Sequence, residues 1–119
     1  MIWYAAHIVM QMVLDNKNDV LAWENIVLIH AQTVEDAYSK ADAAGRAGEG
    51  NSNGTMEWDG VPARMVYRGT RRLVNISSST DIENSPSDGC EVTYMQLEFE
   101  SDEALENFMV GDGFAQLIE

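Results

Sequence analysis

Residues 1–14 read MIWYAAHIVMQMVL. Apolar side chains fill every even position from Tyr4 to Leu14, which is the two-residue period of a β-strand with one buried side. The polar run DNKND at 15–19 supplies turn residues, and WENIVLIHA at 23–31 follows as a second run rich in β-forming residues. The two runs therefore predict an antiparallel hairpin.

Burial limits how the two strands of this hairpin can pair. The even positions of the first strand must share a face with the apolar residues of the second strand, which are Trp23, Val27, Ile29 and Ala31. The numbers of paired residues must therefore sum to an odd number. One such register sets Ile8 beside Ile29. The same register brings His7 opposite His30 on the second face.

The two histidines are candidates for a site. Facing imidazoles could bind a transition metal or form a pH-sensitive contact between the strands. Neither a cysteine nor a carboxylate at ligand spacing completes a metal site around His7 and His30. The alternative is that both histidines are partly buried residues of the sheet without a site role. We expect no metal and no other cofactor.

Apolar residues also occur on the second face of the hairpin, at Val9, Val13, Ile26 and Leu28. The exposed apolar side chains of such a sheet face are expected to be buried by another segment or another chain. A second copy of the chain is one candidate, which predicts a homodimer. The C-terminal segment FAQLI at 114–118 is the other candidate.

A helix is predicted after the hairpin, in TVEDAYSKADAAG. Thr33 is placed as its N-cap, the acids of the first turn complement the positive helix end, and Gly45 is a natural C-terminal stop. The alanine-rich stripe of this helix permits close packing on a sheet. A second short helix, DEALENFM, is expected after a cap at Ser101 or Asp102.

Three further strands are predicted. Two of them, at 63–67 and 72–76, form a hairpin around a turn at 68–70. The third is CEVTYMQLEFE at 90–100. Between the hairpin and this strand lies the polar stretch 77–89, which predicts a mobile loop.

These elements predict the α+β class. The expected arrangement has two layers, with about five mostly antiparallel strands and two helices packed on one sheet face. A chain of 119 residues with 45% hydrophobic content has the size and composition of one domain. A single compact domain over 1–119 is therefore expected.

Charge is distributed unevenly along the chain. The net charge is −13, and eleven acidic residues with no Lys or Arg among them lie between Asp81 and Glu119. Such a chain repels polyphosphate and anionic lipid, so neither direct nucleic-acid binding nor membrane docking is expected. It favours a basic protein partner, as in an antidote or another regulatory interaction module. The residues predicted to face this partner are Glu98, Glu100, Asp102, Glu103, Trp3 and Trp58.

Four of the seven basic residues cluster in the sequence at Arg64, Arg68, Arg71 and Arg72. Guanidinium groups suit oxyanions, so the cluster predicts a site for a phosphate or a carboxylate, with anion or small-ligand binding as an alternative function. The competing interpretation is that these side chains pair with acidic groups of the same chain.

The sequence has no recognisable catalytic motif. An enzyme is the second alternative, and it would need a cleft that combines His7 or His30 with a carboxylate. Cys90 is the only cysteine, so no internal disulfide can form, which fits the reducing cytoplasm. A non-enzymatic cytoplasmic module is therefore the first hypothesis.

Three stretches carry a resemblance to a known family: WYAAHIVMQMV at 3–13, WENIVLIHAQTVEDAYSKA at 23–41 and GCEVTYMQL at 89–97. Together they resemble a small bacterial family catalogued as domain of unknown function 4288. The resemblance covers most of the chain. It implies a compact cytoplasmic domain with a Trp-Tyr strand, a second strand and an alanine-rich acidic helix in this order, and it implies no activity and no catalytic or binding residues.

Overall fold

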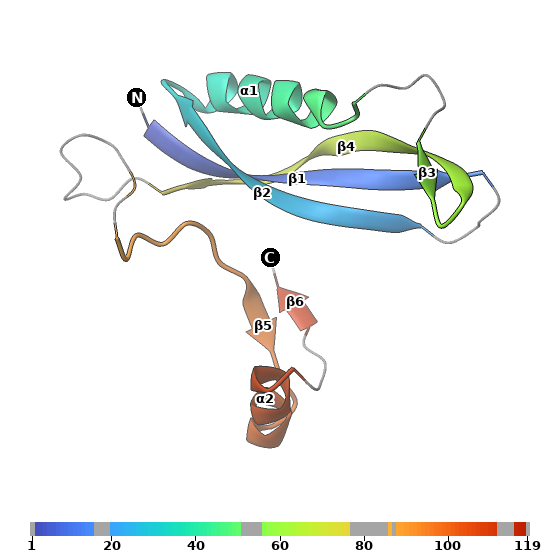
Figure 1. Cartoon of the computed structure of the whole chain (residues 1–119). Helices are drawn as coiled ribbons and strands as arrows, with labels where there is room; N and C mark the ends of the chain where they lie inside the picture. Colours follow the sequence, from blue (N-terminus) through green and yellow to red (C-terminus); the bar gives the residue numbers. More distant parts are fainter. Residues whose placement is uncertain are drawn as a thin grey trace.

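The described part of the chain folds into two helices and two antiparallel sheets (Figure 1). The computed structural model describes residues 2–15, 20–50, 56–76, 86, 88–111 and 116–118. The elements in chain order are β1 (Ile2–Leu14), β2 (Leu21–Ala31), α1 (Val34–Ala47), β3 (Glu57–Trp58), β4 (Val61–Asn75), β5 (Gln96–Glu98), α2 (Asp102–Met109) and β6 (Gln116–Ile118). The predicted α+β class and the antiparallel pairing are confirmed.

The main sheet has four strands in the order β2-β1-β4-β3. β1 lies inside this sheet, because β2 pairs along one of its edges and β4 along the other. β5 and β6 pair only with each other among the described strands and form a second, two-stranded sheet. The long apolar strand at the start of the chain is therefore the centre of the fold.

β1 and β2 form the predicted hairpin, with the predicted residues on each face. The register is displaced by four residues from the predicted one: His7 lies opposite Ile26, and His30 lies opposite Trp3. The prediction that His7 faces His30 is therefore wrong. Alternation of apolar residues fixes only whether the pair sum is odd or even, and a shift by four leaves every side chain on its face.

β4 is one continuous strand of 15 residues, so the hairpin predicted around residues 68–70 is wrong. The register of β4 against β1 shifts at two points, which leaves Arg68 and Arg71 as the extra residues of two β-bulges. Gly69 lies between them with a φ of 137°. The glycine that suggested a turn instead serves a bulged strand, since glycine adopts such a backbone conformation without a steric penalty.

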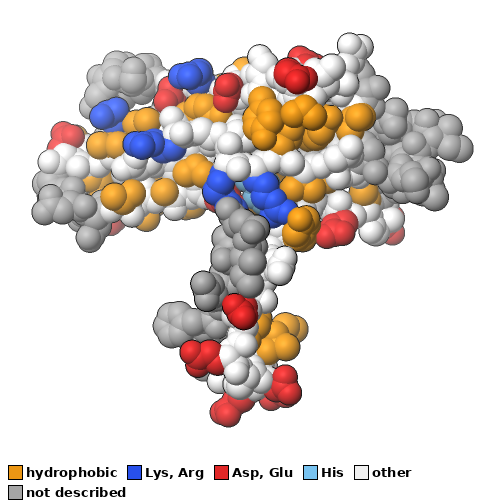
Figure 2. All heavy atoms as spheres, turned by 180° about the vertical axis from the view of Figure 1, so that it is seen from behind, with side chains coloured by type: hydrophobic (Ala, Val, Ile, Leu, Met, Phe, Trp, Pro, Cys, Tyr) orange, Lys and Arg blue, Asp and Glu red, His pale blue; other side chains and the backbone are white. Residues whose placement is uncertain are grey.

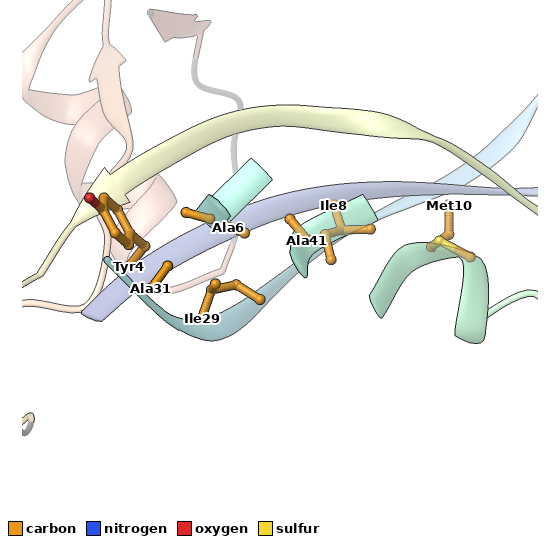
Figure 3. Close-up of a cluster of buried hydrophobic side chains, with 8 residues drawn as sticks. Tyr4, Ala6, Ile8, Met10, Ile29, Ala31 and Ala41 are labelled. Atoms are coloured by element: carbon orange, nitrogen blue, oxygen red, sulfur yellow. The ribbon is translucent and has the colours of Figure 1, made fainter. Parts of the chain in front are cut away.

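The hydrophobic core lies between the main sheet and α1 (Figure 3). We call this side of the sheet the near face and the opposite side the far face. The core side chains come from the even positions of β1 and from β2 and α1, and they are Tyr4, Ala6, Ile8, Met10, Ile29, Ala31, Ala37 and Ala41. The alanines let the helix approach the sheet closely, as the sequence predicted.

α1 begins as predicted, because the Asp36 backbone N–H donates to Thr33 Oγ1 at 3.0 Å. Its end differs from the prediction, since the C-cap is Gly48 and Gly45 lies inside the helix. Gly45 is buried against the Tyr67 ring, where a Cβ atom would lie 2.2 Å from ring atom Cδ1. This glycine is therefore explained by packing against β4.

α2 begins at Ser101, one of the two predicted caps, with the Ala104 N–H donating to Ser101 Oγ at 3.1 Å. It does not lie beside α1 on the near face, and that part of the prediction is wrong. β5, α2 and β6, which we call the arm, project from the opposite side of the main sheet (Figure 1). The reason is that the chain before β5 crosses the far face of the sheet.

The arm gives the molecule an extended shape. The Cα radius of gyration is 17.7 Å, against roughly 13.5 Å for a compact chain of this length. The single domain over 1–119 stays a prediction, and the polar loop at 77–89 lies mostly outside the described residues. None of the helices in the described part of the chain is long and apolar enough to cross a membrane.

Candidate functional site

His7 is the one buried polar or charged side chain among the described residues, with 1% of it exposed. β1 places it on the far face, in the middle of the sheet, between Ile26 of β2 and Arg72 of β4. A buried imidazole needs hydrogen-bond partners for its ring nitrogens. His7 has two, one from the sheet and one from the C-terminal part of the chain.

The two ring nitrogens of His7 contact a carboxylate and a hydroxyl. Nδ1 lies 2.8 Å from Glu24 Oε2, and Nε2 lies 2.5 Å from Thr93 Oγ1. Because a carboxylate only accepts, Nδ1 carries a proton and donates it to Glu24. In a neutral ring Nε2 then accepts from the Thr93 hydroxyl. His7 thereby connects β2 to residue 93, which lies before β5.

Glu24 also pairs with Arg71 through both carboxylate oxygens. Arg71 Nη2 donates to Oε2 at 2.8 Å, and Arg71 Nε donates to Oε1. The hydrogen bonds from Arg71 are the main reason that the pKa of Glu24 falls from 4.5 to about 2, with a further lowering by His7 and a partial opposing effect of burial. The same contact raises the pKa of Arg71. Glu24 is therefore a carboxylate held in its charged form.

Arg72 holds the chain next to Thr93. Its Nη1 donates to the Tyr94 carbonyl oxygen at 2.9 Å, and its guanidinium carbon lies 4.1 Å from the centroid of the Tyr94 ring. This is the geometry of a cation–π contact. We call residues 90–95 the crossing segment. We call the contacts that fix it the clasp, which consists of His7, Glu24, Arg71, Arg72, Thr93 and Tyr94.

The clasp places a histidine between a carboxylate and a hydroxyl, as hydrolase triads do. Three features oppose a catalytic role. His7 is almost fully buried, both of its ring nitrogens are engaged, and the Glu24 carboxylate is shared with Arg71. A nucleophile and its base must reach a substrate. The arrangement instead holds the crossing segment on the far face of the sheet.

The structure separates the two histidines that the sequence suggested as a pair. The His30 ring stacks on Trp3, with ring centroids 4.3 Å apart and planes 3° from parallel. Trp3, predicted to face a partner, is half-buried in this stack. No group of three or more His, Cys, Asp or Glu side chains that could hold a metal occurs within the described ranges.

The four arginines make different contacts. Arg71 and Arg72 belong to the clasp, where a carboxylate and a carbonyl occupy them. Arg64 and Arg68 are exposed on the far face, and Arg68 Nη1 donates to Gln11 Oε1 at 3.0 Å. The cluster is therefore divided between internal contacts and a pair of exposed cations, and anion binding by the four arginines stays a prediction.

The predicted partner-facing acids lie on the arm. Glu98, Glu100, Asp102 and Glu103 are all exposed. Within the described part of the chain, the salt bridges join Glu24 to His7 and Arg71, and Asp36 to Lys40. No described cation therefore neutralises the acids of the arm, and Figure 2 shows red side chains and no blue ones over the lower part of the arm.

Apolar side chains lie exposed beside these acids. In and after α2 they are Leu105, Phe108, Met109 and Val110, of which Met109 and Val110 are 73% and 79% exposed. Phe108 contacts Phe99 at 5.2 Å between ring centroids. Trp58, the other predicted partner-facing aromatic, lies far from the arm in sequence and packs edge-on against Trp23.

Three members of the clasp were not predicted as site residues: Glu24, Thr93 and Tyr94. Every register with an odd sum of paired residue numbers places Glu24 on the same face as His7. The sequence could therefore have indicated Glu24 as a member of the site. Nothing in the sequence indicates Thr93, because its contact with His7 joins residues 86 positions apart.

The comparisons with known proteins place the chain in a family. No curated protein and no solved structure gives a significant match. Residues 3–94 match the family described as Domain of unknown function (DUF4288), and this stretch contains every residue of the clasp and ends before the arm. Since the match extends over more than half of the 119 residues and confirms the resemblance, the chain belongs to the DUF4288 family.

Proposed function

We propose that the chain is a non-enzymatic protein–protein interaction module of the cytoplasm, and that its arm binds a partner that presents a basic surface. The observation that carries this proposal is the set of acidic side chains on the arm, which are exposed and form no salt bridge with any described residue. Unneutralised charge on a projecting element attracts an oppositely charged protein and orients its approach.

The apolar residues of the arm support the same proposal. An eight-residue helix and a ladder of three-residue strands are too short to be stable in water without tertiary packing. Among the described elements, α2 makes no extensive contact with any other helix or strand. A partner that covers Leu105, Met109 and Val110 would supply the missing apolar contacts.

The clasp supports the proposal by fixing the base of the arm. The crossing segment is bound to β1 through Thr93 and to β4 through Tyr94. Because these contacts involve a buried imidazole and a cation over a ring, they hold the arm at one place on the far face. An arm with a fixed base loses less conformational entropy on binding than a free tail.

Capture from the native cell extract tests the proposal. Replacing Asp102 and Glu103 together with lysine is expected to reduce the retained partner at least roughly tenfold, because like charges then meet at the contact. Retention by the wild-type chain should also fall steeply as salt rises from about 0.05 M to about 0.5 M, since ions screen exposed charges. The retained proteins are quantified by mass spectrometry.

A matched control exists in the other helix. Glu35 and Asp36 occupy the first turn of α1 as Asp102 and Glu103 occupy that of α2. Replacing Glu35 and Asp36 with lysine changes the net charge equally and should leave partner retention near the wild-type value. Equal losses in both variants, or retention that does not respond to salt, would contradict the proposal.

A further inference from the structure

The arm needs a partner surface with a defined chemistry. A complementary surface would place cations opposite Asp102, Glu103 and Glu106. It would also place apolar side chains opposite Leu105 and Met109. The same chain carries such a surface on the far face of its own main sheet. This inference rests on the proposed function, because it assigns the partner of the arm.

The far face has a basic patch beside the crossing segment. Its apolar floor is formed by half-buried valines of β1 and β4, and its charge comes from two exposed arginines; its members are Val9, Val13, Val66, Arg64 and Arg68. Neither Arg64 nor Arg68 forms a salt bridge with the residues that the structure describes. Arg68 donates to the neutral amide of Gln11, and no described carboxylate compensates its charge.

The arm of one molecule does not cover its own patch. Both the patch and the base of the arm lie on the far face, and the arm projects away from the sheet there (Figures 1 and 2). α2 therefore points toward any molecule that faces this side of the sheet. A second molecule that turns its far face toward the first would present its basic patch to α2.

We propose that the arm of one molecule docks on the basic patch of a second copy, so that two chains exchange arms reciprocally across a twofold axis. Each contact joins acids of α2 to Arg64 and Arg68 and places apolar residues of α2 on the valine floor. A twofold arrangement makes the two contacts identical, which is the usual symmetry of homodimers. The local complementarity acts against the repulsion between two chains of net charge −13.

Sedimentation equilibrium with charge-reversed variants tests this inference. The arm variant carries Asp102→Lys and Glu103→Lys, and the patch variant carries Arg64→Glu and Arg68→Glu. Each variant alone is expected to dimerise at least roughly tenfold more weakly than the wild-type chain. An equimolar mixture of the two should recover dimers, because a lysine arm then meets a glutamate patch and an acidic arm meets an arginine patch.

The variant with Glu35→Lys and Asp36→Lys should dimerise like the wild type, and far-ultraviolet circular dichroism confirms that each variant is folded. A wild-type chain that stays monomeric, a dimer that neither variant weakens, or a mixture that fails to recover dimers would overturn the inference. A monomeric chain whose arm variant loses a basic partner from the extract would leave the proposed function standing, so the two failures are distinguishable.

Discussion

Replacing His7 with alanine is expected to lower the free energy of unfolding by roughly 2–4 kcal/mol. The change leaves a cavity in the middle of the sheet, since His7 is 1% exposed. It also removes the hydrogen bonds to Glu24 and Thr93, and thereby releases the crossing segment from β1. Urea unfolding measures the loss. It is a large fraction of the roughly 5–15 kcal/mol that stabilises a domain of this size.

Two pairs of variants separate the packing of His7 from its hydrogen bonds. His7→Gln keeps a donor and an acceptor near the two partners and should lose less stability than His7→Ala. Thr93→Val keeps the shape of the side chain and removes the hydroxyl, whereas Thr93→Ser keeps the hydroxyl. Protease cleavage between β4 and β5 should therefore increase in Thr93→Val and stay near the wild-type rate in Thr93→Ser. Equal cleavage in both would show that the clasp does not hold the segment.

The stability difference between the wild-type chain and Glu24→Gln is expected to shrink in acid. The folded-state pKa of Glu24 is about 2, below the ordinary value of 4.5, chiefly because Arg71 donates to its carboxylate. A carboxyl with a depressed pKa contributes stability that is complete above 4.5 and is lost as the pH falls toward 2. Chemical unfolding at about pH 6 and about pH 3 measures the change.

The main partner of Glu24 does not reverse this direction. Arg71 stays charged throughout the range, so its contact favours the ionised carboxylate at both pH values. Glu98→Gln serves as the control, since Glu98 is exposed and forms no salt bridge with described residues. A difference between wild type and Glu24→Gln that stays constant from about pH 6 to about pH 3 would rule out the ionic contact.

The faces of the strands could be predicted from the sequence, whereas the register could not. Alternation in β1 assigned Tyr4, Ile8 and Met10 to the core, and the structure buries all three. The same alternation is compatible with every register in which the numbers of the paired residues sum to an odd number. The choice among these registers depends on contacts such as the stacking of Trp3 on His30, which no local pattern reveals.

Glycines were the least reliable signals for the ends of elements. Gly45 and Gly69 were each interpreted as the end or the turn of an element. The first lies inside α1 because the Tyr67 ring occupies the space of a Cβ atom, and the second lies between two bulges of β4. In both cases a tertiary contact or a register shift, and not the local sequence, explains the residue.

The candidate site was predicted only in part, because a β-bulge decides which face of the sheet two of its arginines reach. Arg71 and Arg72 are consecutive, and in a regular strand they would point to opposite faces. The bulge at Arg71 lets both reach the far face, where they meet Glu24 and Tyr94. Charge composition predicted acids available for a partner, because the absence of Lys and Arg after residue 81 leaves them few internal partners.

Amide hydrogen exchange of the purified chain, diluted until it is monomeric, tests the central claim most directly, namely that the arm is an uncovered surface for a partner. We expect the α2 amides to exchange at least roughly 100-fold faster than those in the middle of β1, since no described helix or strand makes extensive contact with α2. Protection of α2 equal to that of β1 would contradict the account, because the arm would then be stable and covered without a partner.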